Sequence, residues 1–243
     1  MIDDLYLGVD ACSGGWISVI HSKKQSWKAK IFKNISALWN EYYSANIILI
    51  DIPIGLRNNS GKARLCDAAA RKYLTRTRSS SIFPTPCRKA LQATSYDDAN
   101  KINKQVTGKG LSKQTYNIIP KIKEIDYLLS KKPHAADIFI ESHPEVCFTE
   151  LNHGSPMNHY KKTTRGIQER IKLLKMISNW NIEPIKYVEQ KFTKSELAID
   201  DLLDAWILAI SASFGKKQLK FLPKNYERDE KELPMRIAYP NVK

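Results

Sequence analysis

Residues 47–50, Ile-Ile-Leu-Ile, form an unbroken apolar run that stops at Asp51. A short run of this kind, rich in β-branched side chains, is typical of a strand that is buried on both faces of a sheet. An earlier apolar run, over residues 5–10, also ends in a carboxylate, Asp10, and a Gly14-Gly15 turn leads from it directly into a third run. The chain therefore indicates an α/β fold in which acidic residues stand at the ends of buried strands.

The N-terminal segment is predicted to form hairpin strands followed by a helix. Strands are expected at 5–10, 15–21 and 26–32, with turns between them. A helix that is capped by Ser36 should then lead to the buried strand. Three hairpin strands, a helix and further strands separated by helices indicate a sheet of mixed direction.

The rest of the chain is predicted to be rich in helix. Residues 60–135 should be mostly helical, with loops at 79–86 and at 108–110. The elements expected after this region are a strand at 138–140 that ends at Glu141, an amphipathic helix at 166–178, a strand at 185–188, and a helix that starts at a Thr193–Glu196 capping box and runs to about Ala212. Because no internal repeat or low-complexity tract is present, we expect a single domain over 1–243.

The chain is strongly basic, with 39 Lys and Arg against 25 Asp and Glu and a formal net charge of +14. Such a charge favours phosphate-bearing partners, so nucleic acid (DNA or RNA) or a nucleotide is the expected partner. The excess is spread over the chain and forms no dense tail, so general solubility is the competing explanation.

Cysteine spacing and apolar stretches indicate where such a chain resides. Four cysteines lie far apart without a Cys-x-x-Cys pair, which favours buried free thiols in a reducing compartment over zinc ligands: Cys12, Cys66, Cys87 and Cys147. No apolar stretch reaches the roughly 18 residues that span a bilayer, and the acidic start, Met-Ile-Asp-Asp, lacks the pattern of a signal peptide. We therefore expect a soluble, cytoplasmic protein with no membrane partner.

Asp10, Asp51 and Glu141 each end a predicted buried strand. In an α/β sheet, ligands gather outside the strand ends, and three acids there would repel one another unless a positive group lay between them. A fourth acid, Asp204, stands in a helix that is apolar on nearly every side, where a carboxylate is costly unless it is paired or binds a metal. Asp201 lies three residues earlier, so it can share the same helix face.

Acids in this arrangement suit a hard divalent cation, Mg²⁺ or Mn²⁺, which takes a few carboxylates plus water and substrate phosphate. Two such ions about 3.5–4 Å apart would form a phosphodiester site, in which one activates the attacking water and the other stabilises the leaving oxygen. Each acid also has an ordinary explanation, as a turn residue, a solvated helix residue at Asp201, or a buried partner of Lys or Arg at Asp204. Asp200, four residues before Asp204, is an alternative to Asp201 on the same face.

The chain resembles the domain-of-unknown-function 429 family in six ordered motifs: GVDACSGGW, LIDIPIGL, ARKYLTRTRSSSIFPTPCRKAL, TGKGLSKQTYNIIPKIKEID, ESHPEVCF and DDLLDAW. The resemblance covers about residues 5–215 and the closing PMRIAY. Members of this family are described as predicted RNase H-like nucleases. The resemblance implies a mixed five-stranded sheet, with its first three strands antiparallel, surrounded by helices. The helical stretch at about 60–135 is then an insertion.

The same resemblance implies roles for the acids. Within this fold, Holliday-junction resolvases carry one acid on the first strand, one on the fourth and a pair on the last helix. The residues with a similar placement, and so the implied metal ligands and catalytic acids, are Asp10, Asp51, Asp201 and Asp204. Glu141 is an addition to that pattern, and it is either a further catalytic ligand or the partner of Lys121 or Arg88. Junction resolvases are commonly dimers, so a homodimer is also expected.

The insertion holds an arginine-rich segment in which arginines alternate with hydroxyl groups close to Phe83. Arginine binds phosphate bidentately, hydroxyl groups donate further hydrogen bonds, and the Phe83 ring offers a face on which a base can stack. The predicted substrate-binding residues are Arg71, Arg76, Arg78, Ser80, Arg88, Lys109 and Lys121. The competing explanation is that these arginines bind acids within the protein.

Two other segments, the Thr107–Ser112 loop and the residues around His143, also carry candidate functional groups. The Thr107–Ser112 loop lacks the spacing and the preceding strand of a Walker motif, so we expect only a flexible, basic loop close to the site. His143 has the chemistry to move a proton, but structural hydrogen bonding is the favoured role.

The leading hypothesis is a divalent-metal-dependent nuclease that cuts DNA or RNA by in-line attack of water. Sugar kinases and related ATPases also place an Asp at the end of the first strand, before a Gly turn, but they repeat the fold twice, and only one copy is visible in this sequence. The remaining alternatives are a small nucleotide phosphohydrolase and a non-catalytic nucleic-acid-binding domain.

Overall fold

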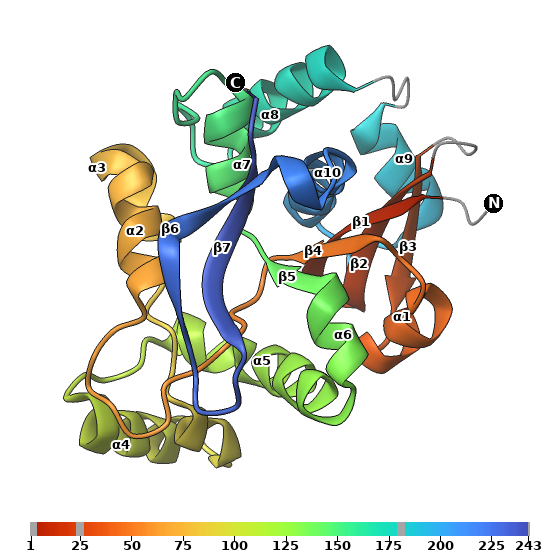
Figure 1. Cartoon of the computed structure of the whole chain (residues 1–243). Coiled ribbons are helices and arrows are strands. Elements are labelled where there is room, and N and C mark those ends of the chain that lie inside the picture. The colour runs from red at the N-terminus through yellow and green to blue at the C-terminus, as the bar shows by residue number, and fades with distance from the viewer. Residues whose placement is uncertain (1–3, 23–26, 179–182, 243) are drawn as a thin grey trace.

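The computed structural model describes residues 4–22, 27–178 and 183–242. A five-stranded sheet lies at its centre, in the order β3-β2-β1-β4-β5 (Figure 1). The strands are β1 (Leu5–Cys12), β2 (Gly15–Ser22), β3 (Lys28–Phe32), β4 (Ile47–Ile50) and β5 (Phe139–Glu141). The first three are antiparallel, whereas β4 is parallel to β1 and β5 is parallel to β4. This arrangement confirms the predicted mixed sheet and has the layout of an RNase H-like fold.

Helices separate the later strands, as predicted. The first helix, α1 (Ile35–Tyr42), leads from β3 to β4. Between β4 and β5 the chain forms α2 (Leu65–Tyr73), α3 (Thr75–Arg78), α4 (Tyr96–Thr107), α5 (Lys113–Lys131) and α6 (Pro133–Ile138), with 3₁₀ turns at Ser79–Ser81 and Arg88–Gln92. After β5 follow α7 (Pro144–Leu151), α8 (Thr164–Ile177), α9 (Pro184–Lys191), α10 (Ile199–Ser213), a 3₁₀ turn at Lys216–Gln218, and the strands β6 (Leu219–Arg228) and β7 (Pro234–Pro240).

Both faces of the sheet are covered by helices (Figure 1). The core on one face includes residues of α10, α7, α8 and α9, and the core on the other face includes residues of α1, α5 and α6. Successive side chains of a strand point to opposite faces. Ile48 and Ile50 therefore enter the core with α1 and α5, while Ile47 and Leu49 enter the core with α10.

Gly8 in β1 allows α10 to approach the sheet closely. A Cβ atom at this position would lie 2.0 Å from the carbonyl oxygen of Ala205 and 2.2 Å from the amide nitrogen of Ala209, both in α10. Because these atoms belong to the backbone, no side-chain movement would relieve the clash. Glycine at position 8 is therefore needed for the depth at which α10, and with it Asp204, lies against the sheet.

Two local predictions are wrong. Residues 185–188 lie in α9, which begins at Pro184, and not in a strand. A short apolar run does not by itself distinguish a strand from a buried helix, and proline at the first helical position favours the helix. The cap of α1 is Asn34, whose side chain accepts a hydrogen bond from the Ala37 amide, instead of the predicted Ser36.

The boundaries of two other elements also differ from the prediction. Only one of the two bonds of the predicted Thr193–Glu196 box forms: the Thr193 amide donates to Oε2 of Glu196 at 2.9 Å, but the Glu196 amide donates to the Thr193 carbonyl instead of the hydroxyl. These residues close a separate turn, and α10 begins only at Ile199. The strand predicted at 26–32 begins at Lys28 in the structure, and its first predicted residue lies outside the described residues.

The β6–β7 hairpin was not predicted and forms a sheet of its own. One parallel bridge, between Ser142 and Ala238, joins β7 to the end of β5, and the hairpin contacts α2 (Figure 1). The four cysteines are buried free thiols, as expected. Among the described residues, none of the helices combines the length and the apolar character needed to cross a bilayer.

Candidate metal centre

Strands β1 and β4 bring two of the predicted acids together at their carboxyl ends. The strands are parallel with Val9 opposite Ile50, and the Asp51 amide donates a hydrogen bond to the Val9 carbonyl at 3.0 Å. Asp10 and Asp51 therefore follow side by side, and the closely packed α10 places Asp204 against them. One carboxylate oxygen from each of these three residues lies within 4.8 Å of the other two.

The three acids line a cavity of about 420 Å³, which we call the acid cavity. Asp200 and Asp201, in the first turn of α10, line it as well. So does Glu145 of α7, which sequence reasoning did not single out. The acid cavity therefore brings together every aspartate that the sequence pointed to, and it adds a carboxylate from a fourth element.

Burial and mutual repulsion raise the pKa values of three acids in the cavity, Asp10, Asp51 and Asp201. Asp10 is 7% exposed and Asp204 only 1%. Burial, followed by the charges of Asp51 and Asp204, holds the pKa of Asp10 well above its ordinary value. Burial also raises the pKa values of Asp51 and Asp201 to about 7, with further contributions from Asp204 and Asp200 respectively. A cation bound among the carboxylates would lower all of these pKa values.

One positive charge is already present in the acid cavity. Lys161, just before α8, places its Nζ 2.5 Å from Oδ2 of Asp204 and 3.9 Å from Oδ2 of Asp200. Burial alone would lower the pKa of Lys161, but the carboxylates of Asp204 and Asp10 outweigh burial and raise it, so the ammonium stays charged. Sequence reasoning missed Lys161 because nothing in the local sequence distinguishes it from the adjacent Lys162.

Two carboxylate oxygens in the acid cavity have no hydrogen-bond partner among the described residues. Oδ1 of Asp204 and Oε2 of Glu145 are buried and make no hydrogen bond. The other oxygen of Glu145 accepts from Arg170, and the Nε of Arg78 lies 4.0 Å from Oε2. Buried polar atoms without partners are costly, and oxygen ligands of this kind suit a hard divalent cation. The residues present therefore fit a metal ion, and the buried carboxylates could bind one.

Glu141 belongs to a different group of side chains. Its carboxylate accepts hydrogen bonds from Arg64 at 2.5 and 2.9 Å and from the Ile54 amide at 2.7 Å. The expectation that Glu141 pairs with Lys121 or Arg88 is therefore wrong. The buried Arg64 lies ten residues after Ile54, and local sequence reasoning gave no reason to choose it over the other arginines.

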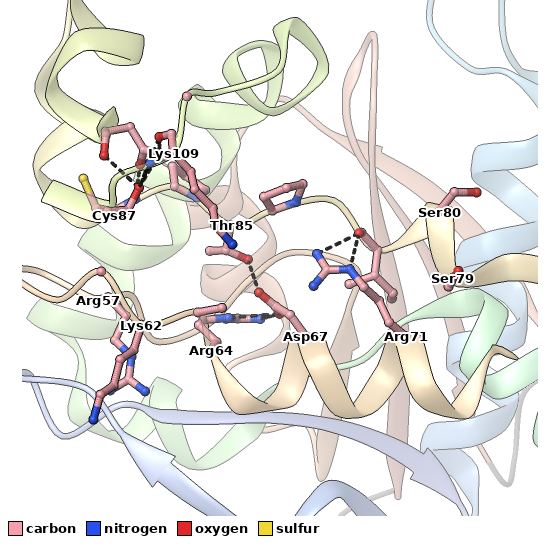
Figure 2. Close-up of a pocket in the computed structure, with 18 residues that line it drawn as sticks. Arg57, Lys62, Arg64, Asp67, Arg71, Ser79, Ser80, Thr85, Cys87 and Lys109 are labelled. Carbon is pink, nitrogen blue, oxygen red and sulfur yellow. Dashed lines mark hydrogen bonds and ion pairs between the residues drawn. The ribbon is translucent and has the colours of Figure 1, made fainter. Parts of the chain in front are cut away.

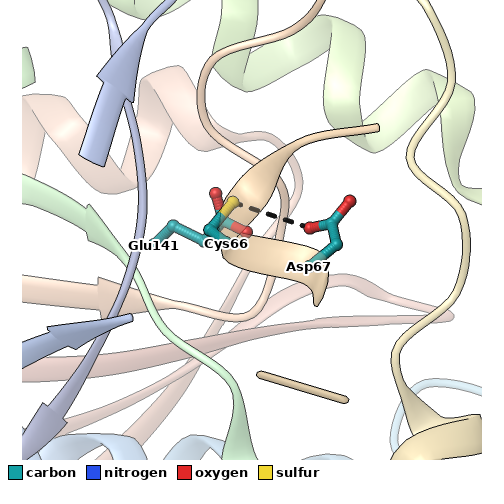
Figure 3. A group of neighbouring side chains, drawn as sticks. All are labelled: Cys66, Asp67 and Glu141. Carbon is teal, nitrogen blue, oxygen red and sulfur yellow. Dashed lines mark hydrogen bonds between the residues drawn. The ribbon is translucent and has the colours of Figure 1, made fainter. Parts of the chain in front are cut away.

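Figure 3 shows Glu141 beside Cys66 and Asp67, three residues whose ligand atoms also lie close together. Arg64 donates to Asp67 at 2.7 Å as well as to Glu141, so both carboxylates already have a cationic partner. Both carboxylates of this group are therefore neutralised without a metal ion. The acid cavity differs, because six carboxylates and only three cationic side chains, Arg78, Lys161 and Lys162, line it among the described residues.

Arg88 and Lys121 have partners within the protein. Arg88 donates to Asp126 at 2.9 Å and also pairs with Asp229. The Lys121 ammonium lies 3.5 Å from Glu124 and 4.8 Å from the centre of the Trp16 ring. For Arg88 this is the competing explanation given above, in which an arginine binds acids within the protein.

The other predicted substrate-binding residues divide between two cavities. Arg78, Ser80 and Phe83 line the acid cavity. Arg71 and Lys109 line a neighbouring cavity of about 510 Å³, which we call the basic cavity, and Ser80 lines both (Figure 2). The remaining predicted substrate-binding residue, Arg76, is exposed on α3 and lines neither cavity.

His143 lines the acid cavity but makes structural hydrogen bonds. Its Nδ1 accepts from the Glu145 amide at 3.2 Å and so caps α7, while Nε2 lies 3.4 Å from the Ser81 carbonyl. Burial lowers the pKa of His143, and a neutral ring with its proton on Nε2 satisfies both contacts.

The family model described as protein of unknown function (DUF429) matches residues 8–228, which is most of the chain. The protein therefore belongs to this family, as the six motifs indicated. No curated protein and no solved structure matches the chain.

Proposed function

We propose that this protein is a nuclease that hydrolyses phosphodiester bonds of nucleic acid with Mg²⁺ or Mn²⁺. The observation that carries the proposal is the convergence of three acids, two from the ends of adjacent parallel strands and one from the helix that crosses them. The net charge of +14 supports a polyanionic substrate, because excess positive charge attracts the phosphate groups of nucleic acid.

In this proposal, some side chains of the acid cavity bind the metal ion and another binds the substrate. Asp10, Asp51 and Asp204 would hold the ion, with the unpartnered Oδ1 of Asp204 as one ligand atom. Such an ion lowers the pKa of the attacking water and stabilises the leaving oxygen. The buried Nη2 of Arg78 has no hydrogen-bond partner among the described residues and lines the same cavity, so it can bind a phosphate oxygen of the substrate.

The test is a cleavage assay on end-labelled single strands, duplexes and four-way junctions of DNA and on the corresponding single-stranded and duplex RNA. We expect cleavage of at least one of these substrates with Mg²⁺ or Mn²⁺ and none with EDTA. The Asp10→Asn and Asp204→Asn variants should lose at least about a hundredfold in rate, because each removes a ligand charge. Asp97→Asn is the matched control, since Asp97 is exposed on α4, and it should retain full activity.

One contact favours a second candidate, a nucleic-acid-binding domain without catalysis. The ion pair of Lys161 with Asp204 neutralises part of the acid cluster without any metal ion. In that case the protein would bind nucleic acid equally well in EDTA and in Mg²⁺, would cleave no substrate in the panel, and Asp10→Asn would leave binding unchanged. Release of inorganic phosphate from nucleoside triphosphates, measured in parallel, would instead indicate a phosphohydrolase.

A further inference from the structure

The basic cavity lies next to the acid cavity and has the opposite charge. It is lined by the segment 57–64, α2, the loop at 79–86, and the end of α4 with its connection to α5 (Figure 2). Five cationic side chains and one acidic side chain line it: Arg57, Lys62, Arg64, Arg71 and Lys109, with Asp67. Its volume of about 510 Å³ falls within the range of small-molecule sites.

Two of the five cations are neutralised by the protein itself. Arg57 pairs with Glu227, and Arg64 pairs with Asp67 and Glu141. The second oxygen of the Asp67 carboxylate accepts from the Thr85 hydroxyl at 3.0 Å. The single acid in the lining is thus fully occupied and does not oppose an anionic ligand.

The other three cations have no acidic partner among the described residues: Lys62, Arg71 and Lys109. Arg71 donates from Nε and Nη2 to the Ile82 carbonyl at 3.1 and 3.0 Å, which fixes its guanidinium without neutralising it. Figure 2 shows Arg71 on α2 at one side of the cavity, with Lys109 and Lys62 on the other. A ligand that satisfies cations on both sides must carry negative charge, and phosphate is the anion that arginine and lysine bind best together.

The remaining walls suit an apolar, flat group and its hydroxyls. Ile82, Pro84 and Pro86 supply apolar surface, and Ser79 and Ser80 supply hydroxyl groups. A ligand with a phosphate, a hydroxylated ring and a flat hydrophobic face matches all three features. These are the parts of a nucleotide.

The segment from Ser79 to Phe83 separates the two cavities. Ser80 lines both of them, Ile82 lines the basic cavity, and Phe83 lines the acid cavity. A nucleic-acid strand bound across this segment would place one phosphate in the acid cavity while an adjacent nucleotide enters the basic cavity.

We propose that the basic cavity binds one unpaired nucleotide of the strand that is cut in the acid cavity. This inference rests on the proposed nuclease function and specifies its substrate class as nucleic acid with a single-stranded or extruded nucleotide beside the scissile bond. A base in an intact duplex is covered by its partner and stacked between its neighbours, so it cannot enter a cavity in the protein without being flipped out.

The test measures binding in EDTA, so that catalysis plays no part. Fluorescence anisotropy compares a labelled single-stranded 12-mer with the matching blunt duplex, for the unmodified protein, for Lys62→Ala/Lys109→Ala, and for Lys101→Ala/Lys104→Ala. All four lysines are exposed, and both variants lose two positive charges. Lys101 and Lys104 lie on α4 and line neither cavity. We expect tighter binding of the single strand, and about a tenfold loss of that affinity in Lys62→Ala/Lys109→Ala alone.

Each outcome bears on a distinct claim. Equal losses in the two double variants, preferential binding of duplex, or no binding of either nucleic acid would overturn the nucleotide subsite. If deoxyadenosine monophosphate binds in a Lys62- and Lys109-dependent way while the single strand does not, the occupant is a free nucleotide and the strand assignment fails. A selective loss of single-strand binding together with no cleavage in Mn²⁺ would keep the subsite and refute the nuclease function.

Discussion

Lys161 is the residue that most affects the charge balance of the acid cavity and its capacity to bind a metal ion. Its ammonium binds one oxygen of Asp204, and the other oxygen has no hydrogen-bond partner in the part of the chain that the structure describes. A lysine in this position lowers the repulsion among the acids in the metal-free protein. It would also compete with a metal ion for Asp204, because both would bind the same carboxylate.

Replacing Lys161 separates these two effects. In Lys161→Met we expect Mn²⁺ to bind about tenfold more tightly, since the competing cation is gone. We also expect the metal-free protein to lose about 1–3 kcal/mol of stability, because Asp204 stays buried without its partner. Titration calorimetry and urea denaturation measure the two quantities. Lys172→Ala, which removes an exposed charge on α8 outside the acid cavity, is the control, and unchanged Mn²⁺ affinity in Lys161→Met would refute the competition.

Glu141 should behave as a structural residue, because Arg64 holds its carboxylate. We expect Glu141→Gln to lower the free energy of unfolding by about 1–3 kcal/mol, since a charged partner of the buried Arg64 is lost. Mn²⁺ affinity should stay within about twofold of the original. Asp51→Asn removes one negative charge from the centre itself and should instead abolish Mn²⁺ binding. Equal losses of Mn²⁺ affinity in the two variants would place Glu141 among the ligands.

At the scale of elements, the site depends on how closely α10 packs on β1. Gly8→Ala tests this dependence, because the added Cβ would meet the α10 backbone at 2.0 Å. We expect the free energy of unfolding to fall by about 3 kcal/mol. Mn²⁺ binding should also weaken, since Asp204 would move away from Asp10 and Asp51. Urea denaturation and Mn²⁺ titration of the same samples measure both. Gly61→Ala, where the nearest atom lies at 3.4 Å, should change neither quantity.

The elements also show what local sequence patterns can and cannot predict. The strands that carry Asp10 and Asp51 were predictable because burial on two faces leaves a continuous apolar run. The run at 185–188 was ambiguous between strand and helix, and its tertiary setting decided for α9. The β6–β7 hairpin escaped prediction because β6 is rich in charged residues and only partly buried, and because prolines lie inside β6 and at both ends of β7.

The acid cluster was predictable for a similar reason, and its counter-charges were not. Parallel strands that end in acids must bring those acids to one edge of the sheet. The pairing of Lys161 with Asp204, and of Arg64 with Glu141, joins positions 43 and 77 residues apart. Nothing in the local sequence marks which lysine or arginine the fold will bring to a given carboxylate.

For the whole molecule, the raised pKa values predict how stability depends on pH. Asp51 and Asp201 have pKa values of about 7 in the folded protein and about 3.9 when unfolded. Between these values unfolding releases protons, so the metal-free site should lose stability as pH rises from about 4 to about 7, and change little above that. The stabilisation by Mn²⁺ should increase over the same window, because the ion needs ionised ligands.

Urea denaturation at pH 5, 6, 7 and 8, in EDTA and in Mn²⁺, measures this dependence. Other groups titrate in the same range, so the site's contribution is the difference between the protein and its Asp51→Asn/Asp201→Asn variant. We expect the variant to gain stability relative to the protein as pH rises in EDTA, and to lose the response to Mn²⁺. A difference that is independent of pH in EDTA would contradict the raised pKa values.

The most direct test of the central claim is anomalous scattering from crystals soaked in Mn²⁺. We predict a strong peak among Asp10, Asp51 and Asp204, with Oδ1 of Asp204 as a ligand. The absence of a peak, with Lys161 still bound to Asp204 at saturating Mn²⁺, would contradict a metal centre and leave the acids as partners of internal cations.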